Sequence, residues 1–361
     1  MIEIKVVVIG AGPAGLTAAM QLCRYRIPFV LLEKERAGGL LWEANLVENY
    51  PGFPAGVGGA KLAHLMVTQA ERIGVQLSKE RVLRVATLAK GEIEATLPKT
   101  LIAASASSKM LADYRPQTSG EQVVGVANFE ETNGVLRSKT SRFQTKSRPK
   151  GSVDSASDKH PGRFLILTDQ NEYCASYVIV ATGTAPRPLP LLVPPECTGL
   201  VYSSILPLLA VSDKQTLIVG AGDAAFDYAL RLAKNRNSVT ILNRGREVKC
   251  LQLLWERASS HPAIAYRAAW PLVAVEAGET VDRLRVRGEA GQALEADFLL
   301  FAIGRVPQAN FLSTEWLAHP PAGLFLVGDV RNGLYRQAAI AAGEGLRAAM
   351  HIYFDMETDT V

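Results

Sequence analysis

The chain has 361 residues, of which 48% are hydrophobic and 20% are charged, and this composition is typical of a globular protein with about two to three domains rather than a fibre or a disordered chain. Its formal net charge of +4 is too weak to indicate nucleic acid as a partner. Met1 leads directly into an apolar stretch and no apolar run is long enough to span a bilayer, so we expect a cytoplasmic protein without a membrane span.

The first sequence feature is a glycine fingerprint between a strand and a helix. An apolar run over residues 4–9 precedes it, a helix-like stretch over 16–26 follows, and a second apolar run over 29–32 ends on Glu33. Such glycines bring backbone N–H groups against a pyrophosphate, and an acid about twenty residues further on accepts the ribose hydroxyls. We therefore predict a dinucleotide site, to which an ordinary strand-to-helix turn is the alternative. Its residues are Gly10, Gly12, Pro13, Ala14, Gly15, Glu33 and Lys34.

Apolar residues at helical intervals predict a covering helix over residues 60–73, which Gly74 closes. Residues 98–161 are polar and poorly periodic, and strand patterns resume at 164–168 and 177–181, so we interpret 98–161 as an insertion. A basic run within it suits docking onto an acidic partner, with a solvated loop as the alternative. The run consists of Arg137, Lys139, Arg142, Lys146, Arg148 and Lys150.

A second unit of the same kind begins with an apolar strand over residues 216–219 and continues into a helix over 224–234. Its returning strand ends on Asn243 where an acid would select the ribose of NAD, and the guanidinium groups of Arg244 and Arg246 follow. This pattern favours the 2'-phosphate of NADPH, with Arg244 as its contact; surface arginines beside an empty or differently occupied fold are the alternative. The remaining predicted residues are Gly220, Gly222, Asp223 and Ala224.

The chain then returns to the first domain. Proline-rich residues 186–195 predict the exit linker, and residues 301–307 predict the return strand and turn. The fold class is therefore α/β, with two Rossmann-like (three-layer ββα) dinucleotide-binding domains, the second inserted into the first. The predicted boundaries are 1–184 with 304–361 for the first domain and 185–303 for the second.

A flavin is indicated by the last strand and helix. Residues 323–327 read as a buried strand ending in Gly328 and Asp329, and residues 336–350 read as a long helix. An acid at the carboxyl end of a parallel strand is well placed for a ribityl hydroxyl, and a helix N-terminus stabilises negative charge on a flavin. A simple helix cap is the alternative for Asp329.

The cysteines and histidines do not predict a metal site. The four cysteines have no CxxC or other ligand spacing, and the five histidines are equally dispersed. We expect inert thiols and no disulfide framework. The cysteines are Cys23, Cys174, Cys197 and Cys250.

Over nearly the whole chain apart from the insertion, these motifs resemble the low-molecular-weight thioredoxin-reductase-like flavoproteins. The resemblance rests on GAGPAGL at 10–16, GGLL at 38–41, ENYPGFP at 48–54, ATG at 181–183, GAGDAA at 220–225, AIGRVP at 302–307, VGDV at 327–330 and RQAAIAAGEG at 336–345. It implies FAD in the first domain, NADPH in the second, and a homodimer whose small domains rotate. It also implies a flavin site that includes Gly39, Leu40, Asn49, Thr182, Gly183, Arg336, Gln337 and Ala338.

The chain departs from this family at the dithiol. Ser203 and Leu206 stand where a CxxC would place its sulfurs, and Pro207 replaces the acid that usually follows. Ordinary thioredoxin reduction is therefore not expected. The relatives that this arrangement resembles are the thioredoxin-reductase-like ferredoxin or flavodoxin NADP reductases, in which no catalytic side chain beyond the flavin is required.

Two alternatives remain open at the sequence level. The family commonly has His-Arg-Arg and a further Arg at the second site, whereas this chain has Asn243-Arg244-Gly245-Arg246. The second site is therefore also compatible with another nucleotide, even a second FAD, in a flavoprotein independent of nicotinamide. The other alternative is a non-catalytic flavin-binding redox sensor.

Overall fold

The computed structural model describes residues 1–88 and 163–358. All of these residues belong to one compact unit. The predicted insertion at 98–161 and its basic run lie outside the described residues, so both stay predictions.

A seven-stranded sheet forms the first half of the described unit, in the order β3-β2-β1-β6-β5-β4 with β17 also on β6. β1, β2, β3, β6 and β17 are mutually parallel, whereas β5 runs antiparallel to both β4 and β6. The strands are β1 (Ile2–Ile9), β2 (Phe29–Leu32), β3 (Leu77–Ser78), β4 (Val82–Leu88), β5 (Arg163–Thr168), β6 (Glu172–Val180) and β17 (Leu324–Leu326).

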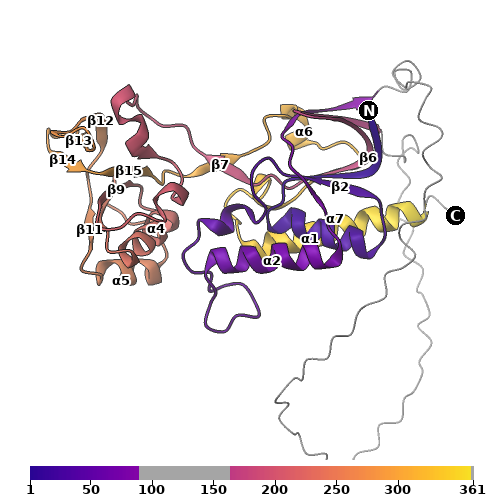
Figure 1. The fold of residues 1–361 in the computed structure, drawn as a ribbon, viewed down its shortest axis with the longest axis horizontal. Coiled ribbons are helices and arrows are strands. Elements are labelled where there is room, and N and C mark those ends of the chain that lie inside the picture. Colours follow the sequence, from indigo (N-terminus) through magenta and orange to yellow (C-terminus); the bar gives the residue numbers. More distant parts are fainter. Residues whose placement is uncertain (89–162, 359–361) are drawn as a thin grey trace, which may run out of the picture. The chain divides into compact units, whose positions relative to one another are not determined.

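Helices α1 (Pro13–Arg24), α2 (Gly59–Ile73) and α7 (Ala338–Thr358) lie along one face of this sheet (Figure 1). Successive side chains of a strand point to opposite faces, and β1 accordingly serves two cores. Val6 and Val8 pack with the helices, while Val7 and Ile9 pack on the other face with residues of β4, β5 and β17. The β-branched run of β1 is buried on both faces, as a central parallel strand requires.

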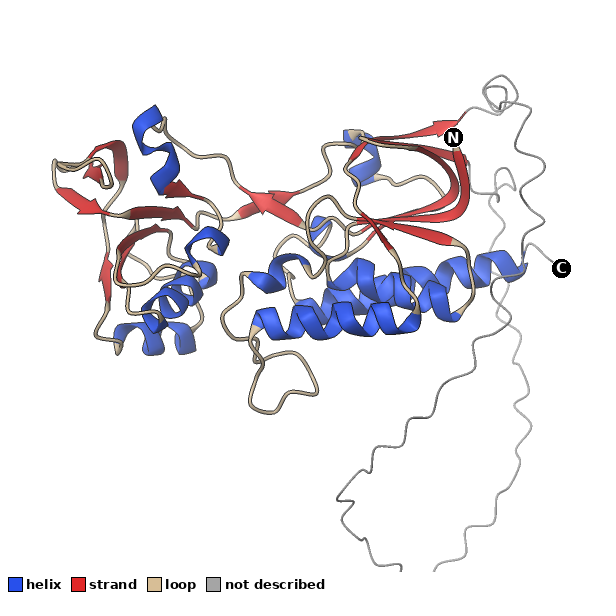
Figure 2. Cartoon of the chain, viewed as in Figure 1, coloured by secondary structure: helices blue, strands red, loops and turns tan. Residues whose placement is uncertain are grey.

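A second, five-stranded parallel sheet has the order β11-β10-β9-β15-β8. Its strands are β8 (Val201–Tyr202), β9 (Gln215–Val219), β10 (Ser238–Leu242), β11 (Ile264–Arg267) and β15 (Phe298–Phe301), and it is accompanied by helices α4 (Asp223–Lys234) and α5 (Gln252–Ser259). Figure 2 also shows the short strands that form two smaller antiparallel sheets. These are β12 (Leu272–Ala277) with β13 (Leu284–Gly288) and β14 (Ala293–Ala296), and β7 (Thr184–Pro186) with β16 (Arg305–Pro307).

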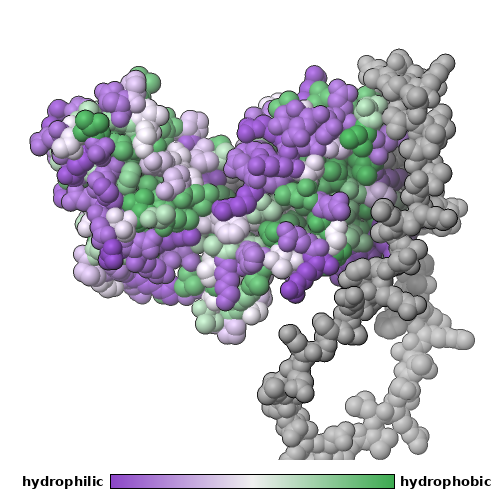
Figure 3. All heavy atoms as spheres, viewed as in Figure 1, coloured by the Kyte–Doolittle hydropathy of each residue, from purple (hydrophilic) through white to green (hydrophobic). Residues whose placement is uncertain are grey.

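The shorter elements complete the connections. They are the short helix α6 (Thr314–Ala318) and the 3-10 helices η1 (Gly39–Trp42), η2 (Pro195–Leu200), η3 (Leu206–Leu208) and η4 (Gly328–Val330). No helix among residues 1–88 and 163–358 combines the length and the apolar character needed to cross a membrane. On the face drawn in Figure 3, hydrophilic residues cover much of the outline and hydrophobic residues form patches between them.

The predicted α/β class with two Rossmann-like units is confirmed, with local corrections; the domain boundaries stay a prediction. Helix α1 begins at Pro13 rather than at residue 16, because a proline fits the first turn of a helix. Helix α7 begins at Ala338 and ends at Thr358, so the predicted 336–350 was shifted and too short. The return segment 301–307 is not one strand, because Gly304, with φ of 102°, separates β15 from β16.

Candidate functional site

A cavity of about 690 Å³ lies at the carboxyl ends of β1, β2, β6 and β17, the edge at which open parallel sheets bind ligands. Its volume lies within the range of roughly 300–1,000 Å³ that is usual for cofactor sites. Most of the predicted flavin-site residues line it: Gly10, Gly12, Pro13, Ala14, Glu33, Lys34, Gly39, Leu40, Thr182, Gly183, Gly328, Asp329, Arg336, Gln337 and Ala338.

Two predicted residues, Gly15 and Asn49, are not among the lining residues. Gly15 keeps α1 close to β1, since a Cβ there would lie 1.8 Å from the carbonyl oxygen of Gly10. The Asn49 Nδ2 donates to Oε1 of Gln337, a lining residue, at 2.6 Å. Both residues therefore contact residues that line the cavity without lining it themselves.

The first glycine turn leaves an anion site at the start of α1. Gly10 has a φ of 98°, and a Cβ there would lie 2.7 Å from the carbonyl oxygen of Ala181. Gly12 caps α1 without a side-chain hydrogen bond, so the first N–H groups of the helix are left for a ligand. A Cβ on Gly39 would lie 3.1 Å from the Cα of Gly12, so two glycines keep this approach open. This cradle suits a pyrophosphate.

Two backbone N–H groups fix the Glu33 carboxylate at the end of β2. Its Oε2 accepts from the N–H of Ala11 at 2.9 Å, and its Oε1 accepts from the N–H of Glu35 at 3.0 Å. Each carboxylate oxygen can accept more than one hydrogen bond, so both remain able to receive ribose hydroxyls.

A second carboxylate in the cavity wall, Glu80, was missed by the sequence analysis. Its side chain is only 4% exposed. Oε1 accepts from Ser78, Asn171 and Tyr173, and Oε2 accepts from Thr168, at 2.6 to 3.1 Å. Its backbone N–H donates to the carbonyl oxygen of Glu33. Glu80 thus ties the end of β2 at Glu33 to β3, β5 and β6, and all of its side-chain partners except Ser78 are too distant in the chain to give a sequence signal.

The end of the cavity at which the flavin ring is expected contains Asp329 and Arg336. Burial raises the pKa of the Asp329 carboxyl, an effect that Arg336 and Arg305 only partly oppose. The Nε of Arg336 is buried and has no hydrogen-bond partner among the described residues. A buried donor of this kind is costly unless a ligand satisfies it, so the lining residues fit a group with acceptor atoms such as FAD.

Glu344 supports this end of the cavity from α7 and was also missed as an individual residue. Its Oε2 accepts from the N–H of Gly328 at 2.6 Å and from Nδ2 of Asn332 at 3.0 Å. One indirect sequence signal exists for this residue, because Glu344 stands inside the RQAAIAAGEG motif.

The second glycine turn resembles the first, because its first glycine also has a positive φ. Gly220 has a φ of 147°, and a Cβ there would lie 2.4 Å from the carbonyl oxygen of Ala302. Gly222 caps α4 without a side-chain hydrogen bond, and α4 begins with Asp223 and the exposed Ala224. The Oδ1 of Asp223 accepts from the N–H of Leu251 at 2.8 Å, so this carboxylate organises the following loop.

Asn243, at the end of β10, shapes the turn that presents the basic residues. Its buried amide donates to the carbonyl oxygen of Glu247 and to the hydroxyl of Tyr266, both at 2.8 Å, and its Oδ1 accepts from the N–H of Gly245 at 3.0 Å. Asn243 is therefore engaged within the turn, and the charged groups that remain beside it are those of the following residues.

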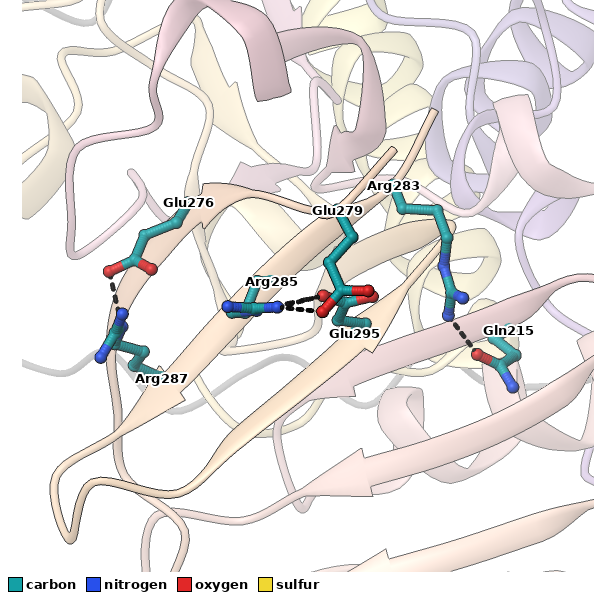
Figure 4. A network of polar contacts seen from close by, with 7 residues as sticks. All are labelled: Gln215, Glu276, Glu279, Arg283, Arg285, Arg287 and Glu295. Atoms are coloured by element: carbon teal, nitrogen blue, oxygen red, sulfur yellow. Dashed lines mark hydrogen bonds and ion pairs between the residues drawn. The ribbon is translucent and has the colours of Figure 1, made fainter. Parts of the chain in front are cut away.

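Arg244 and Arg246 are exposed and have no ion pair within residues 1–88 and 163–358. The arginines around β13 differ, as Figure 4 shows: each has a side-chain partner. The pairs are Arg283 with Gln215, Arg285 with Glu279 and Glu295, and Arg287 with Glu276. The unpaired guanidinium groups after β10 are thus the ones available for an added anion.

All four cysteines are described, and all are free. Cys174 and Cys197 are buried, and burial raises the pKa of both thiols. The segment in which a dithiol would be expected reads Ser-Ser-Ile-Leu over residues 203–206, and the Ser204 hydroxyl donates to Oε1 of Glu43 at 2.9 Å. A raised pKa keeps a thiol protonated and unreactive, which agrees with the expected inert role.

Comparison with known proteins defines the class. A model of the pyridine nucleotide-disulphide oxidoreductase family matches residues 4–345, and the chain belongs to this family of flavin-dependent oxidoreductases. Among curated relatives, the thioredoxin reductase of Penicillium chrysogenum is 28% identical over 397 residues, covering 100% of this chain and 98% of that protein. The thioredoxin reductase of Chlamydia trachomatis is 26% identical, covering 97% of each.

Solved structures show the same fold. Lactococcus lactis thioredoxin reductase, in a structure described as the FR conformation, has a TM-score of 0.70 at 21% identity, covering 98% of this chain and 99% of that one. The T. acidophilum thioredoxin reductase structure also has a TM-score of 0.70 at 21% identity, covering 99% of this chain and 100% of that one. The predicted membership of the thioredoxin-reductase-like flavoproteins is thereby confirmed.

Proposed function

We propose that the protein is an FAD-dependent oxidoreductase that takes electrons from NADPH and passes them to a small carrier protein without using a dithiol of its own. Bound FAD would supply the redox chemistry, because a flavin exchanges electron pairs with nicotinamide and single electrons with a carrier. The observation that carries the proposal is the pairing of two glycine turns with residues 203–206 that read Ser-Ser-Ile-Leu.

The protein's own groups would bind and orient the nucleotides. The uncapped start of α1 is the proposed pyrophosphate site, Glu33 the ribose site and Asp329 the ribityl site. Arg336 would donate its buried Nε to the flavin. Arg244 and Arg246 would hold the 2'-phosphate of NADPH at the second turn.

Two kinds of carrier protein are candidates. A ferredoxin or flavodoxin suits the chain because single-electron transfer needs no cysteine pair. Thioredoxin is favoured by the names of the relatives at full coverage, yet its reduction would have to proceed without a CxxC in this chain. We also propose a cytoplasmic homodimer, supported by the family resemblance and, for the dimer, by the exposed apolar side chains of α7, which are Ile340, Leu346, Met350 and Phe354.

Anaerobic stopped-flow mixing with NADPH tests the electron donor. We expect rapid bleaching of the flavin absorbance, and slower bleaching with NADH. The reduced protein is then offered a ferredoxin, a flavodoxin and an oxidised thioredoxin in separate reactions. Reoxidation by either of the first two supports the proposal, whereas reoxidation by thioredoxin alone would support disulfide reduction. Flavin that NADPH does not bleach would reject this donor and favour a second site that holds another nucleotide.

A further inference from the structure

One face of helix α4 is hydrogen-bonded to the segment that follows η1. Asp227, Tyr228, Arg231 and Lys234 share this face, since residues separated by three or four positions are neighbours on a helix surface. The same helix starts at the second glycine turn, while η1 lines the first cavity. The contacts between them therefore connect the two predicted nucleotide sites.

Glu43 lies at the centre of these contacts. It is 7% exposed, immediately follows η1, and lines the first cavity together with Ser204 and Arg305. Its Oε2 accepts from the hydroxyl of Tyr228 at 2.5 Å, and its Oε1 accepts from the hydroxyl of Ser204 at 2.9 Å. The nearest cation is Nη1 of Arg305, 3.8 Å from Oε2. A buried carboxylate depends on such donors, because leaving it without them carries its full desolvation cost.

Side chains of α4 also form hydrogen bonds with the backbone on either side of Glu43. Nη1 of Arg231 donates to the carbonyl oxygens of Trp42 and Ala44 at 2.9 and 3.0 Å, which satisfies the end of η1. Oδ2 of Asp227 accepts from the N–H of Asn45 at 2.8 Å. Together with the bonds of Glu43, these contacts form what we call the seam: Glu43, Ser204, Tyr228, Arg231 and the Asp227–Asn45 pair.

We propose that Glu43 is a positioning residue that docks helix α4 onto the wall of the first cavity and so holds the orientation in which Ser204 and Leu206 border that cavity. This role rests on the proposed function. Ser204, next to the place where the family's first sulfur would stand, supplies a seam hydroxyl. The segment that lacks a dithiol thus contributes to holding α4 against the cavity wall.

Hydrogen–deuterium exchange tests the seam without relying on activity. Y228F removes the hydroxyl that Glu43 accepts, and we expect exchange in residues 42–48 to rise by about tenfold, the effect of losing one hydrogen bond to a charged group. Y202F is the matched control, because the Tyr202 hydroxyl bonds only locally, to the carbonyl oxygen of Gly199 at 2.6 Å. Exchange that is equal in the two variants would overturn the proposal.

A double variant tests whether Glu43 and Tyr228 act as a pair. E43Q alone should also raise exchange in residues 42–48, and E43Q combined with Y228F should add little to the larger single effect, because coupled residues are not additive. Fully additive effects would mean that the two side chains act independently, which contradicts the proposed seam.

The kinetic test separates positioning from damage to the flavin site. In Y228F we expect the maximal rate of flavin reduction by NADPH to rise by about tenfold, because a loosened seam frees the second glycine turn to approach the cavity that Ser204 and Leu206 border. Reduction by dithionite, which needs no second nucleotide, should keep the wild-type rate. An unchanged rate with NADPH, or an equal change with both reductants, would overturn the positioning role. If NADPH fails to reduce even the wild-type flavin, the proposed function is lost, while the exchange measurement still decides whether the seam exists.

Discussion

Burial raises the pKa of Glu80, but hydrogen bonds from Ser78, Thr168 and Tyr173 outweigh this and bring the pKa below its ordinary value of 4.5. The hydrogen bond between Tyr173 and Glu80 also contributes to raising the pKa of Tyr173 to about 12, with burial as the larger cause. At the scale of single residues, Glu80 is therefore an ionised group that stabilises the fold. Because its folded-state pKa is lowered, its contribution is complete above the unfolded value and is lost as the pH falls through the folded value.

E80Q should accordingly lower the free energy of unfolding by about 1–3 kcal/mol near neutral pH, since Gln cannot accept all four hydrogen bonds. The deficit relative to wild type should shrink as the pH falls below about 4.5. Urea unfolding over a series of pH values measures both effects. E3Q, which affects an exposed pair with Arg163, is the control; a deficit for E80Q that does not vary with pH would contradict the assignment.

A second prediction for single residues concerns the exposed guanidinium groups of Arg244 and Arg246 after β10. The double variant R244A/R246A should raise the KM for NADPH by about tenfold or more and leave that for NADH unchanged, because only NADPH carries the added phosphate. R287A is the matched control, since Arg287 is paired with Glu276 on β13. Equal losses with both nucleotides would show that these arginines do not recognise the phosphate.

At the scale of elements, the contact between α1 and α7 depends on a glycine. A Cβ on Gly345 would lie 2.0 Å from the carbonyl oxygen of Ala14, so the two helix backbones approach closely there. The contact brings α7 against the helix that begins at the first glycine turn, and both helices contribute residues to the wall of the cavity.

G345A should destabilise the protein by about 1–3 kcal/mol and weaken FAD retention, because α7 must move away from α1 to make room for the methyl group. Gly343 offers a matched control on the same helix, since a Cβ there would meet nothing within 4 Å. G343A should be neutral or stabilising by about 0.5–1 kcal/mol. Thermal unfolding compares the two; similar effects would contradict the close approach.

The helices also show how much of the fold can be predicted from the sequence. Periodicity and the end signal at Gly74 predicted α2 to within one residue, because the information is local. The extent of α7 was underestimated, since its last turns follow from tertiary packing rather than from a sequence signal. Spacing after the glycines pointed to Glu33, which lines the cavity, whereas Glu43 and Glu80 were missed because most of their partners lie far away in the chain.

At the scale of the whole molecule, the chain combines two nucleotide turns with free, separated cysteines. Glycines at both turns prevent steric clashes with neighbouring backbone, which lets each turn pack closely against the strand end beside it. The flavin is the central element of this account, because without a dithiol it is the proposed sole relay between donor and carrier.

Cofactor analysis of the purified protein tests this claim most directly. The absorption spectrum and extraction with quantification of every bound nucleotide should give one FAD per chain, retained in the first cavity. Two FAD per chain would contradict the NADPH site at the second turn. A colourless protein that takes up no flavin on reconstitution with FAD would contradict the central claim itself.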